Sequence, residues 1–451
     1  MRECHFDVVV AGSGPAGAVA ALVLARAGAT VLLADAARFP RDKACGDVVG
    51  PRGVALLREL GVLPAEAVPA GDVVLVGPTW RGVRLPWPSG KTYPSDALVV
   101  RRERLDHMLH TAAVCAGAAY RAARLSDVIP EPDEARVRLS DGSRLRASFV
   151  IGADGALSRV ASAVGLLRPH RALWGFALRG YVAGAVSAPH IVFWAPDGRR
   201  PVPGYGWVFP AGRNQVNVGL GLGLRESRKR AALAGRLLPG FVLALESRGL
   251  LPPGTRLETR RGGWLRMGLS GCVPASGRVL LAGDAAGLVN PLQGEGISEA
   301  MASGRAAAKA IVERPGSAAY AYRHALADAF GAFQAEAGAA HQAFVARPHL
   351  RRLVANALTA SVTRRATAPG LAIWWNDLLE GARPGPARTR ALGLAAVVRL
   401  TTGARRRPNQ VLDRPAGGDD GRRRRRHAER QDNDAPEVGA SRAARIVDYS
   451  P

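Results

Sequence analysis

In the segment Arg278–Arg305, the acid Asp284 lies among glycines in a turn that follows an apolar run and precedes a long helical stretch. Val279–Ala282 is short and apolar, which predicts a buried strand, and Asp284 lies where that strand ends. Ligands of open α/β folds bind at such carboxyl ends. Pro291 stiffens the loop before a helix predicted for Ile297–Val312. Without a Cβ, the nearby glycines let backbone pass close to a ligand; they are Gly283, Gly287, Gly294 and Gly296.

The N-terminal segment predicts a nucleotide-binding turn. Phe6–Ala11 is a β-branched run, Gly12–Gly17 fits the pattern G-x-G-x-x-G, and Ala18–Ala27 continues as an alanine-rich helix. Val31–Ala34 predicts a second strand, which ends at Asp35. Strand, turn, helix, strand and acid together form the context of a dinucleotide fingerprint, with phosphates at the helix N-terminus and the acid on the ribose. We expect the phosphates to lie beside Gly12, Gly14, Pro15, Ala16 and Gly17.

Two further polar positions fit a larger cofactor. The apolar segment at Val150 and Ile151 ends in Asp154 and a glycine, over a hundred residues beyond the first fingerprint. Arg102 precedes Asp106 by four residues, at the start of a predicted helix that leads to Cys115. Taken alone, Asp154 and Arg102 could be loop-end residues that have only local partners.

Taken together, these segments resemble the three motifs of the flavoprotein hydroxylase and oxidoreductase superfamily. In that superfamily the first motif binds the adenosine part of FAD, the central Asp-Gly motif touches the pyrophosphate side, and the later Gly-Asp motif holds the ribityl chain. The resemblance implies FAD as the cofactor and no metal. It assigns these roles to Gly12, Gly14, Gly17, Asp35, Arg102, Asp154 and Asp284.

Three other segments narrow the resemblance. They are Phe39–Asp47, Pro203–Pro210 with the following Val216–Gly219, and Asn290–Ile297. Together they resemble the geranylgeranyl reductase family, and most closely its actinobacterial menaquinone reductase branch, from Phe6 to about residue 380. The likeness implies an FAD-dependent reductase that saturates isoprenoid double bonds of a prenyl lipid or quinone by hydride transfer. It adds cofactor-binding positions at Arg41, Cys45, Gly46, Gly283, Pro291, Gly294, Gly296 and Ile297.

The substrate side contains four candidate catalytic residues, Cys45, Asp47, Tyr205 and Trp207. An isolated alkene has no carbonyl to polarise, so its reduction needs a positioned hydride and a proton donor on the opposite side. Tyr205 and Trp207 could line an apolar substrate tunnel or pack one face of an ordinary core, and Cys45 could be a small buried side chain. Many reductases of the family have Cys-Gly-Gly at this point. Asp47 departs from that pattern and could relay a proton or cap the helix after Pro51.

Composition favours a large globular enzyme. The chain has 451 residues, 47% of them apolar, and no apolar run of about 18 residues. The first strand begins near Met1, so we expect no signal peptide, and the four cysteines lie too far apart for a disulfide framework or a metal site. These features predict a cytoplasmic protein. His341 and His349 lie on a helical stretch and are interpreted as structural.

The net charge of +25 comes mainly from arginine, since only four of the 62 basic residues are lysines. Residues 403–451 contribute +4 of it, which leaves +21 on the body and argues against a nucleic-acid partner despite the run Arg422–Arg426. Arginine-rich usage can reflect the base composition of a genome. A basic body would also favour peripheral association with an anionic membrane at its cytoplasmic face.

The fold class expected is α/β, with a Rossmann-like FAD-binding domain in three layers around a mostly parallel sheet. An inserted mixed β-sheet forms the substrate domain, and helices follow. The predicted FAD domain comprises residues 1–75, 96–165 and 275–316, and the substrate domain 76–95 and 166–274. A helical region over 317–402 and a disordered basic tail over 403–451 complete the chain.

Two other functions remain open on the sequence. An FAD-dependent aromatic monooxygenase or halogenase shares the three FAD motifs, although a halogenase is expected to show W-x-W-x-I-P where this chain has Gly206–Pro210. The second alternative is an adaptor protein that binds a membrane or a nucleic acid and has the flavin-enzyme fold without its activity. The electron donor also stays open among NADPH, ferredoxin and a deazaflavin, because no second dinucleotide fingerprint is present.

Overall fold

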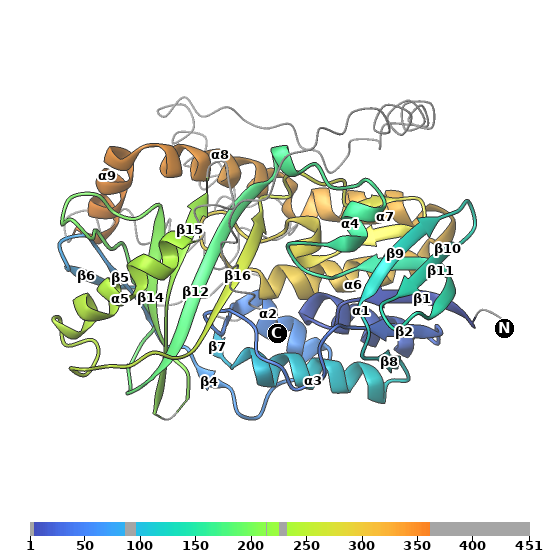
Figure 1. Ribbon diagram of the computed structural model, residues 1–451, viewed down its shortest axis with the longest axis horizontal. Coiled ribbons are helices and arrows are strands. Elements are labelled where there is room, and N and C mark those ends of the chain that lie inside the picture. Colours follow the sequence, from blue (N-terminus) through green and yellow to red (C-terminus); the bar gives the residue numbers. More distant parts are fainter. Residues whose placement is uncertain (1–3, 86–95, 213, 225–231, 361–451) are drawn as a thin grey trace, which may run out of the picture. The chain divides into compact units, whose positions relative to one another are not determined.

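The computed structural model describes residues 4–85, 96–212, 214–224 and 232–360. All of them belong to one compact unit of the chain, which spans Met1–Asp413. Two large sheets organise this unit (Figure 1).

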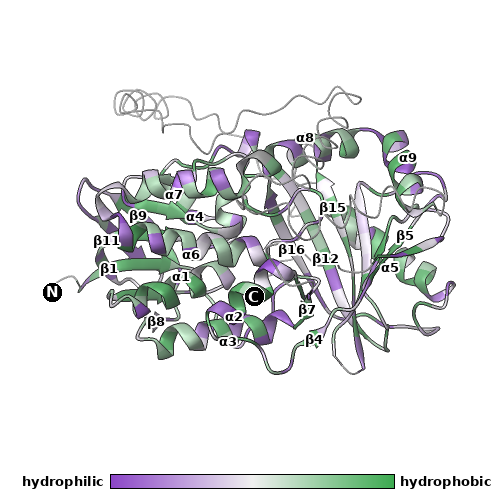
Figure 2. Cartoon of the chain, turned by 180° about the vertical axis from the view of Figure 1, so that it is seen from behind, coloured by the Kyte–Doolittle hydropathy of each residue, from purple (hydrophilic) through white to green (hydrophobic). Residues whose placement is uncertain are grey.

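The first sheet is built on a parallel core. Its parallel strands, in spatial order, are β18 (Val279–Leu281), β11 (Arg144–Gly152), β1 (Cys4–Ala11), β2 (Val31–Ala34) and β8 (Ala119–Arg121). Antiparallel strands extend it: β9 (Leu125–Pro130), β10 (Ala135–Leu139) and β17 (Ala275–Ser276). Strands buried on both faces have nearly continuous apolar sequences, and β1 and β2 follow that rule, since Val8, Val10 and Leu33 are fully buried. Strand β1 is coloured hydrophobic in Figure 2.

Three helices pack together beside this sheet: α1 (Pro15–Arg26), α3 (Arg102–Cys115) and α6 (Ile297–Glu313). Glycines allow the close contacts at the start of α1. A Cβ on Gly17 would lie 1.8 Å from the carbonyl oxygen of Gly12, and one on Gly304 of α6 would lie 2.0 Å from that of Ala16. Any larger residue would push the turn and the two helices apart.

Six further helices complete the described part of the chain. They are α2 (Pro51–Glu59), α4 (Arg159–Ala163), α5 (Ala232–Glu246), α7 (Ala318–Leu326), α8 (Ala332–Ala346) and α9 (Pro348–Thr359). Across the described ranges, none of the helices combines the length and hydropathy that a membrane crossing requires.

The second sheet is mixed. Its order is β16 (Glu258–Met267), β12 (Leu173–Ala183), β15 (Gln215–Leu224), β14 (Gly204–Pro210), β13 (His190–Val192), β5 (Val73–Val76) and β6 (Gly82–Leu85). All neighbours are antiparallel except β13 and β5. A small third sheet has the order β3 (Val48–Val49), β7 (Leu98–Val99) and β4 (Val68–Pro69).

The two faces of the mixed sheet differ because side chains alternate along a strand. On β14, Val208 joins the core under α5, and a Cβ on Gly206 would meet the ring of Phe241 from that helix. Tyr205 and Trp207 point to the other face, where a cavity lies. Helix α8 contacts β15 and α9 contacts β5.

The predicted fold class is confirmed. The strand, turn and helix around Gly12–Gly17 and those around Asp284 lie where the sequence predicted them, and β2 has the predicted bounds. One boundary needs a correction: β5 pairs with β13 in the mixed sheet, so that sheet takes in residues from Val73 although the sequence assigned residues up to 75 to the FAD domain. An apolar strand of four residues fits either sheet, and only the pairing decides. The division into domains otherwise stays a prediction. The predicted tail, residues 403–451, lies outside the described residues, as does the helical region beyond residue 360.

Candidate functional site

The glycine turn between β1 and α1 forms an open cradle. The Asp35 carboxylate accepts hydrogen bonds from the backbone N–H groups of Ser13 (2.7 Å) and Ala37 (2.8 Å), which holds the acid against the turn. The first amides of a helix have no partner within the helix and favour an anion. A Cβ on Gly14 would meet only the Arg41 guanidinium, at 3.6 Å. The space beside Gly14 is therefore open and faces a cation.

A buried ion-pair network supports Arg41. Asp106 of α3 is fully buried and pairs with Arg102 (2.6 Å) and with Arg41 (2.8 Å). Burial alone would raise the pKa of Asp106, but the Arg102 and Arg41 guanidinium groups hold it below its ordinary value. Asp106, the partner of Arg102, therefore also binds Arg41 in a distant segment, so the contacts of Arg102 are not only local.

The central and late acids lie at the ends of neighbouring strands. The Asp154 carboxylate caps α4 by accepting from the N–H of Arg159 (2.7 Å), while its Oδ1 is buried without a hydrogen-bond partner among the described residues. Asp284 follows β18 and faces the Lys43 ammonium at 3.9 Å. A Cβ on Gly12 would meet the Ala153 carbonyl oxygen at 2.4 Å, so the first and central motifs are in contact.

These features fit FAD. Helix N-terminal amides and the Arg41 cation suit a pyrophosphate at Gly14, and Asp35 suits a ribose. The free oxygen of Asp154 offers an acceptor beside them. The late loop places Asp284 on the same side, where a ribityl chain needs acceptors.

A cavity of about 350 Å³ extends from this region across the mixed sheet. The three segments that narrowed the sequence resemblance meet on its wall: Cys45 and Gly46, Tyr205 and Trp207, and the loop 291–296. Direct contacts join them. The Tyr205 hydroxyl donates to the Gln293 carbonyl oxygen, and a Cβ on Gly46 would meet the Phe209 ring at 2.9 Å.

Glycines on the sheet make room for the cavity and its aromatic wall. The Trp207 ring lies over Gly219 on the neighbouring strand, where a Cβ would come within 2.2 Å of the ring. Gly221 and Gly223 of the same strand also line the cavity. Farther along, α8 and α9 close the wall with apolar side chains, namely Phe344, Leu350, Val354 and Leu358.

Asp47 lies behind this wall, at the centre of a buried polar network. Its carboxylate accepts hydrogen bonds from the Tyr181 hydroxyl (2.5 Å), the Asn217 amide (2.8 Å) and the Arg102 N–H (3.2 Å). Asn217 in turn accepts from the Trp207 indole N–H (2.8 Å). Burial raises the pKa of Asp47, and these hydrogen bonds oppose the shift. The network links the Cys45 loop to the aromatic strand.

The structure corrects one alternative for Asp47. Helix α2, which begins at Pro51, has Gly50 at its N-cap and no side-chain cap. Asp47 instead binds the first amide of α3, at Arg102. Its φ of +66° lies in the left-handed region that favours glycine and tolerates aspartate, which explains how an acid stands where the family pattern has glycine.

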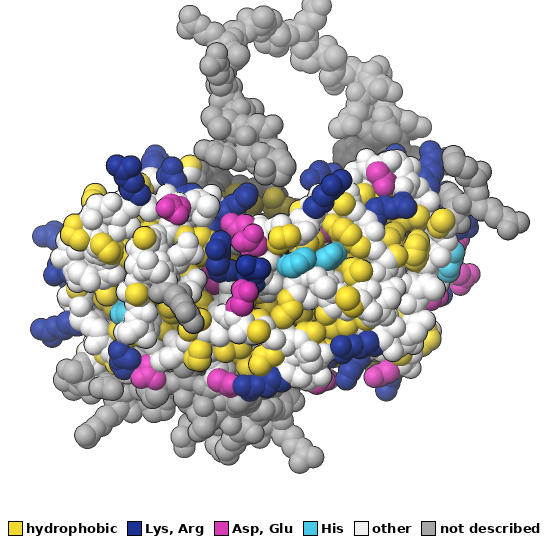
Figure 3. All heavy atoms as spheres, turned by 90° about the horizontal axis from the view of Figure 1, so that it is seen from below, with side chains coloured by type: hydrophobic (Ala, Val, Ile, Leu, Met, Phe, Trp, Pro, Cys, Tyr) yellow, Lys and Arg dark blue, Asp and Glu magenta, His cyan; other side chains and the backbone are white. Residues whose placement is uncertain are grey.

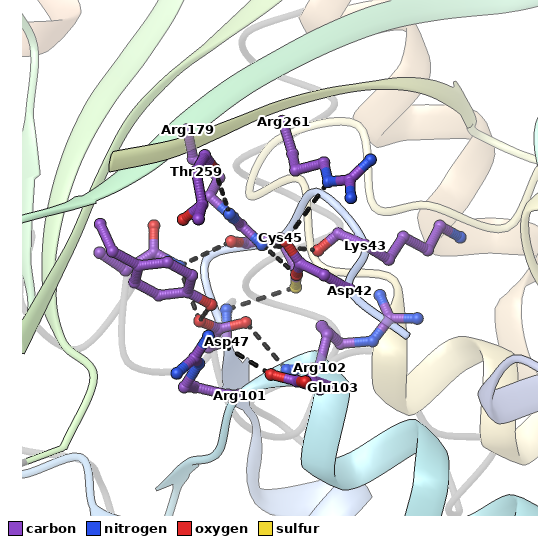
Figure 4. Close-up of polar contacts among 12 residues, drawn as sticks. Asp42, Lys43, Cys45, Asp47, Arg101, Arg102, Glu103, Arg179, Thr259 and Arg261 are labelled. Atoms are coloured by element: carbon purple, nitrogen blue, oxygen red, sulfur yellow. Dashed lines mark hydrogen bonds and ion pairs between the residues drawn. The ribbon is translucent and has the colours of Figure 1, made fainter. Parts of the chain in front are cut away.

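The loop that carries Cys45 is fastened to the mixed sheet (Figure 4). Arg179 of β12 is fully buried; it pairs with Asp42 and donates to the Lys43 carbonyl oxygen at 3.2 Å. Arg261 of β16 reaches the same Asp42 carboxylate at 3.6 Å. The loop therefore bridges the two sheets and fixes Cys45 between them.

Two titratable side chains of the cavity wall hold their protons. Burial raises the pKa of the Cys45 thiol, against the nearby Arg102 guanidinium. Burial also raises the pKa of the Tyr205 hydroxyl, and negative charge at Cys45 or Glu295 would raise it further. Both groups are neutral at pH 7. A thiolate role for Cys45 is not favoured by this environment.

Two carboxyl groups near the cavity were assigned no role from the sequence. Glu295 lines it and accepts from the Gly50 N–H (3.3 Å) and the Ser298 hydroxyl. Glu299 is fully buried, and neither of its carboxyl oxygens has a hydrogen-bond partner among the described residues. Their four-residue spacing at the start of α6 was the signal that could have revealed them.

Replacing Glu299 with glutamine is expected to change how stability depends on pH. Burial, together with the Glu295 charge, raises the pKa of Glu299 well above its ordinary 4.5. The folded protein then keeps a proton that the unfolded chain releases, so the free energy of unfolding falls above pH 4.5, by up to about 1.4 kcal/mol per pH unit. Glu299→Gln removes this loss.

Thermal melts across pH 4 to 9, roughly bracketing that interval, provide the measurement. The variant should melt above the wild type at pH 8, and the difference should shrink toward pH 4. Glu313→Gln, an exposed change at the end of the same helix, is the control. If the melting temperatures of wild type and Glu299→Gln changed with pH in the same way, the prediction would be wrong.

The structure brings most of the predicted site residues together. Around one cavity lie Pro15, Cys45, Gly46, Arg102, Tyr205, Trp207, Asp284, Pro291, Gly294, Gly296 and Ile297. Asp47 is not on the cavity wall, and the roles of the whole set stay predictions. His341, interpreted as structural, does line the cavity, although burial lowers its pKa to about 4 and keeps it neutral. Sequence reasoning assigned no role to Asn217, Tyr181, Arg179 or Asp42; only cross-sheet packing reveals these partners.

Comparisons with known proteins show which families this chain is similar to. A family profile described as "FAD binding domain" matches residues 5–188. The chain is 37% identical over 320 residues to a menaquinone reductase of Mycolicibacterium smegmatis, which covers 67% of this chain and 75% of that protein. It is 35% identical over 332 residues to digeranylgeranylglycerophospholipid reductase 1 of Methanopyrus kandleri, covering 68% and 81%.

Solved structures share the fold. A geranylgeranyl bacteriochlorophyll reductase-like protein of Thermoplasma acidophilum superposes with a TM-score of 0.67 at 21% identity, covering 89% of this chain and 99% of that one. The flavin-dependent brominase Bmp2 superposes with a TM-score of 0.66 at 17% identity, covering 88% and 99%. At such identities the likeness shows the fold alone. The cofactor of this chain is FAD, as the matching family profile indicates.

Proposed function

The chain belongs to the family of FAD-dependent oxidoreductases that contains the menaquinone and geranylgeranyl reductases, and from this we propose that it saturates an isoprenoid double bond of a prenyl quinone or lipid. The observation that carries the proposal is the cavity. It runs from the predicted flavin side, at Pro15 and Asp284, to apolar side chains of α8 and α9. A cavity with this lining suits a long hydrocarbon chain whose reacting bond lies near the cofactor.

The chemistry needs a hydride, a proton and a fixed geometry. Bound FAD, once reduced, supplies the hydride to one alkene carbon. The residues of the chain supply the positioning. We propose that Tyr205 and Trp207 hold the prenyl segment and that Cys45 packs at the flavin side. Asp47 fixes Asn217 and, through it, the Trp207 ring.

The direct test is anaerobic turnover by the wild-type protein. The flavin is reduced with dithionite, and menaquinone or a geranylgeranyl lipid is added. We expect the flavin to reoxidise and the lipid to gain two daltons in mass for each double bond reduced. NADPH, ferredoxin and a reduced deazaflavin can then be compared as electron donors. Hydroxylation of an aromatic ring in oxygen, without hydrogenated lipid, would contradict the proposal.

The halogenase alternative has weaker support. The similarity to the brominase concerns the fold only, at 17% identity. When Pro210 is aligned with the proline of W-x-W-x-I-P, the aromatic strand of this chain has Tyr205 in place of the first tryptophan and Phe209 in place of the isoleucine. Trp207 also donates its indole N–H to Asn217, which commits it to the wall of the cavity.

We propose that the protein takes its substrate from an anionic membrane surface. Leu353 on α9 is 68% exposed, on the helix whose Leu350, Val354 and Leu358 line the cavity. The net charge of +25 favours anionic lipid. On the face shown in Figure 3, basic side chains lie among acidic and hydrophobic ones.

Vesicle flotation tests this membrane proposal. Vesicles containing phosphatidylglycerol should bind the protein, whereas pure phosphatidylcholine vesicles should bind it at least several-fold less. Leu353→Asp should weaken binding without changing the flavin spectrum. Equal flotation with both vesicle types, or full binding by Leu353→Asp, would contradict it.

A further inference from the structure

Reduction of an unactivated alkene leaves one hydrogen unexplained by the flavin. Besides the Cys45 thiol, the Lys43 ammonium and His341, the cavity wall contains one tyrosine and two carboxyl groups. Tyr205 donates its hydroxyl hydrogen to the Gln293 carbonyl oxygen. Asp47 is off the wall, with its carboxylate occupied by Tyr181, Asn217 and Arg102. Asp284 faces Lys43. Glu295 remains as a carboxyl group that lines the cavity.

Glu295 has a second acid directly behind it. Glu299 follows by four residues, is fully buried, and has no hydrogen-bond partner for either carboxyl oxygen in the described part of the chain. An ionised carboxylate buried in that way is costly unless it is paired. Two neighbouring carboxyl groups in such a place do not both ionise, so the pair retains one proton.

The charged surroundings are compatible with a shared proton. Burial raises the pKa of Glu295, and the Ser298 hydroxyl, the Arg52 guanidinium and the Gly50 N–H oppose that shift. At Glu299, Asp284 adds to the effect of Glu295, and Arg52 opposes both. One cation therefore faces two acids, so that one negative charge is balanced and the second acid stays protonated.

We propose that Glu295 and Glu299 form a proton-delivering pair, in which Glu295 protonates the alkene carbon opposite the hydride. Resting on the proposed function, the step balances as follows. The reduced flavin loses a hydride and is oxidised, one alkene carbon gains that hydride, and the other gains the proton from the Glu295 carboxyl group. This is the single proton that the pair holds, and water returns one proton to the pair before the next turnover.

The experiment compares Glu295→Gln, Glu295→Asp and Glu299→Gln with the exposed control Glu313→Gln, all as full-length protein with FAD. After dithionite reduction, a geranylgeranyl lipid is added and the two-dalton product is followed in single turnovers across pH. Glu295→Gln should slow hydrogenation at least 100-fold with unchanged flavin occupancy. Glu295→Asp should restore part of the rate, and Glu299→Gln should move the falling limb of the pH profile to lower pH.

Infrared spectra of substrate-free protein give a measurement independent of turnover. At pH 7 the wild type should show the carbonyl stretch of a buried carboxylic acid, shifted in heavy water. Glu299→Gln should lose this band, and Glu313→Gln should keep it.

The outcomes separate the two proposals. If wild type hydrogenates the lipid but Glu295→Gln does so equally fast, the proton-delivering pair is wrong. An unchanged infrared band in Glu299→Gln would also overturn it. If wild type hydrogenates no prenyl substrate while the infrared band behaves as expected, the proposed function fails and the acid pair stands as a buried proton-holding site.

Discussion

Replacing Gly14 with valine is expected to abolish FAD binding and leave the fold intact. Gly14 has φ −72° and ψ −176°, a backbone conformation that any residue adopts, and a Cβ there meets only the Arg41 guanidinium at 3.6 Å. The protein itself has room for the valine side chain. The pyrophosphate that we expect beside this turn would be excluded, because the valine methyl groups would occupy its place.

The measurement is flavin content after purification, with affinity for added FAD by titration. We expect at least a 100-fold loss of affinity and a melting temperature equal to that of wild-type apoprotein. Gly235→Val is the matched control, since a Cβ at Gly235 of α5 meets nothing within 4 Å and this helix covers the other sheet. Full flavin in Gly14→Val would place the pyrophosphate elsewhere. A substitution at Gly17 would not separate loss of FAD binding from loss of folding, because a Cβ there collides with Gly12 in the protein.

Replacing Trp207 with alanine is expected to slow prenyl reduction at least tenfold while the protein keeps its FAD. The change removes roughly 2–3 kcal/mol of apolar contact to a bound chain, and misplacement of the alkene costs further rate. It also leaves the Asn217 side-chain oxygen without its indole donor, which loosens the network around Asp47. Single-turnover hydrogenation with flavin occupancy measures the effect.

Two variants separate substrate contact from loss of core packing. Trp194→Ala removes a buried tryptophan that packs on Phe241 under α5 and does not line the cavity. It should lower the melting temperature comparably, since each change costs about 3–5 kcal/mol of stability, without a matching loss of rate in the folded protein. Trp207→Phe should lie between wild type and alanine. Equal rate losses in Trp194→Ala and Trp207→Ala would show that Trp207 acts through stability alone.

Local patterns were sufficient for the cofactor half of the molecule. Near Gly12, Asp35 and Asp284, a strand, a turn and a helix follow one another within about thirty residues, which is the length of one βαβ unit. In such a unit the same residues decide both the local structure and the place of the ligand. The bounds of β2 and the start of α6 at Ile297 were therefore predictable.

The substrate half depended on pairings that no local pattern encodes. The alternation of Tyr205 and Trp207 predicted a strand but left open whether its aromatic face met a core or a cavity. That choice follows from Gly219, Gly221 and Gly223 on the neighbouring strand, which leave space that larger side chains would fill.

The sequence by itself determined the α/β fold, the FAD-binding turn and the family, because these depend on short-range spacing of glycines, acids and apolar residues. Only the tertiary structure decided what surrounds the reacting bond. Asp47 became a buried anchor for α3 and Asn217, and Glu295 reached the cavity with Glu299 behind it, once segments at least 55 residues apart were packed together. Burial and hydrogen bonding between distant segments, which set the protonation of an acid, are properties of the packed chain.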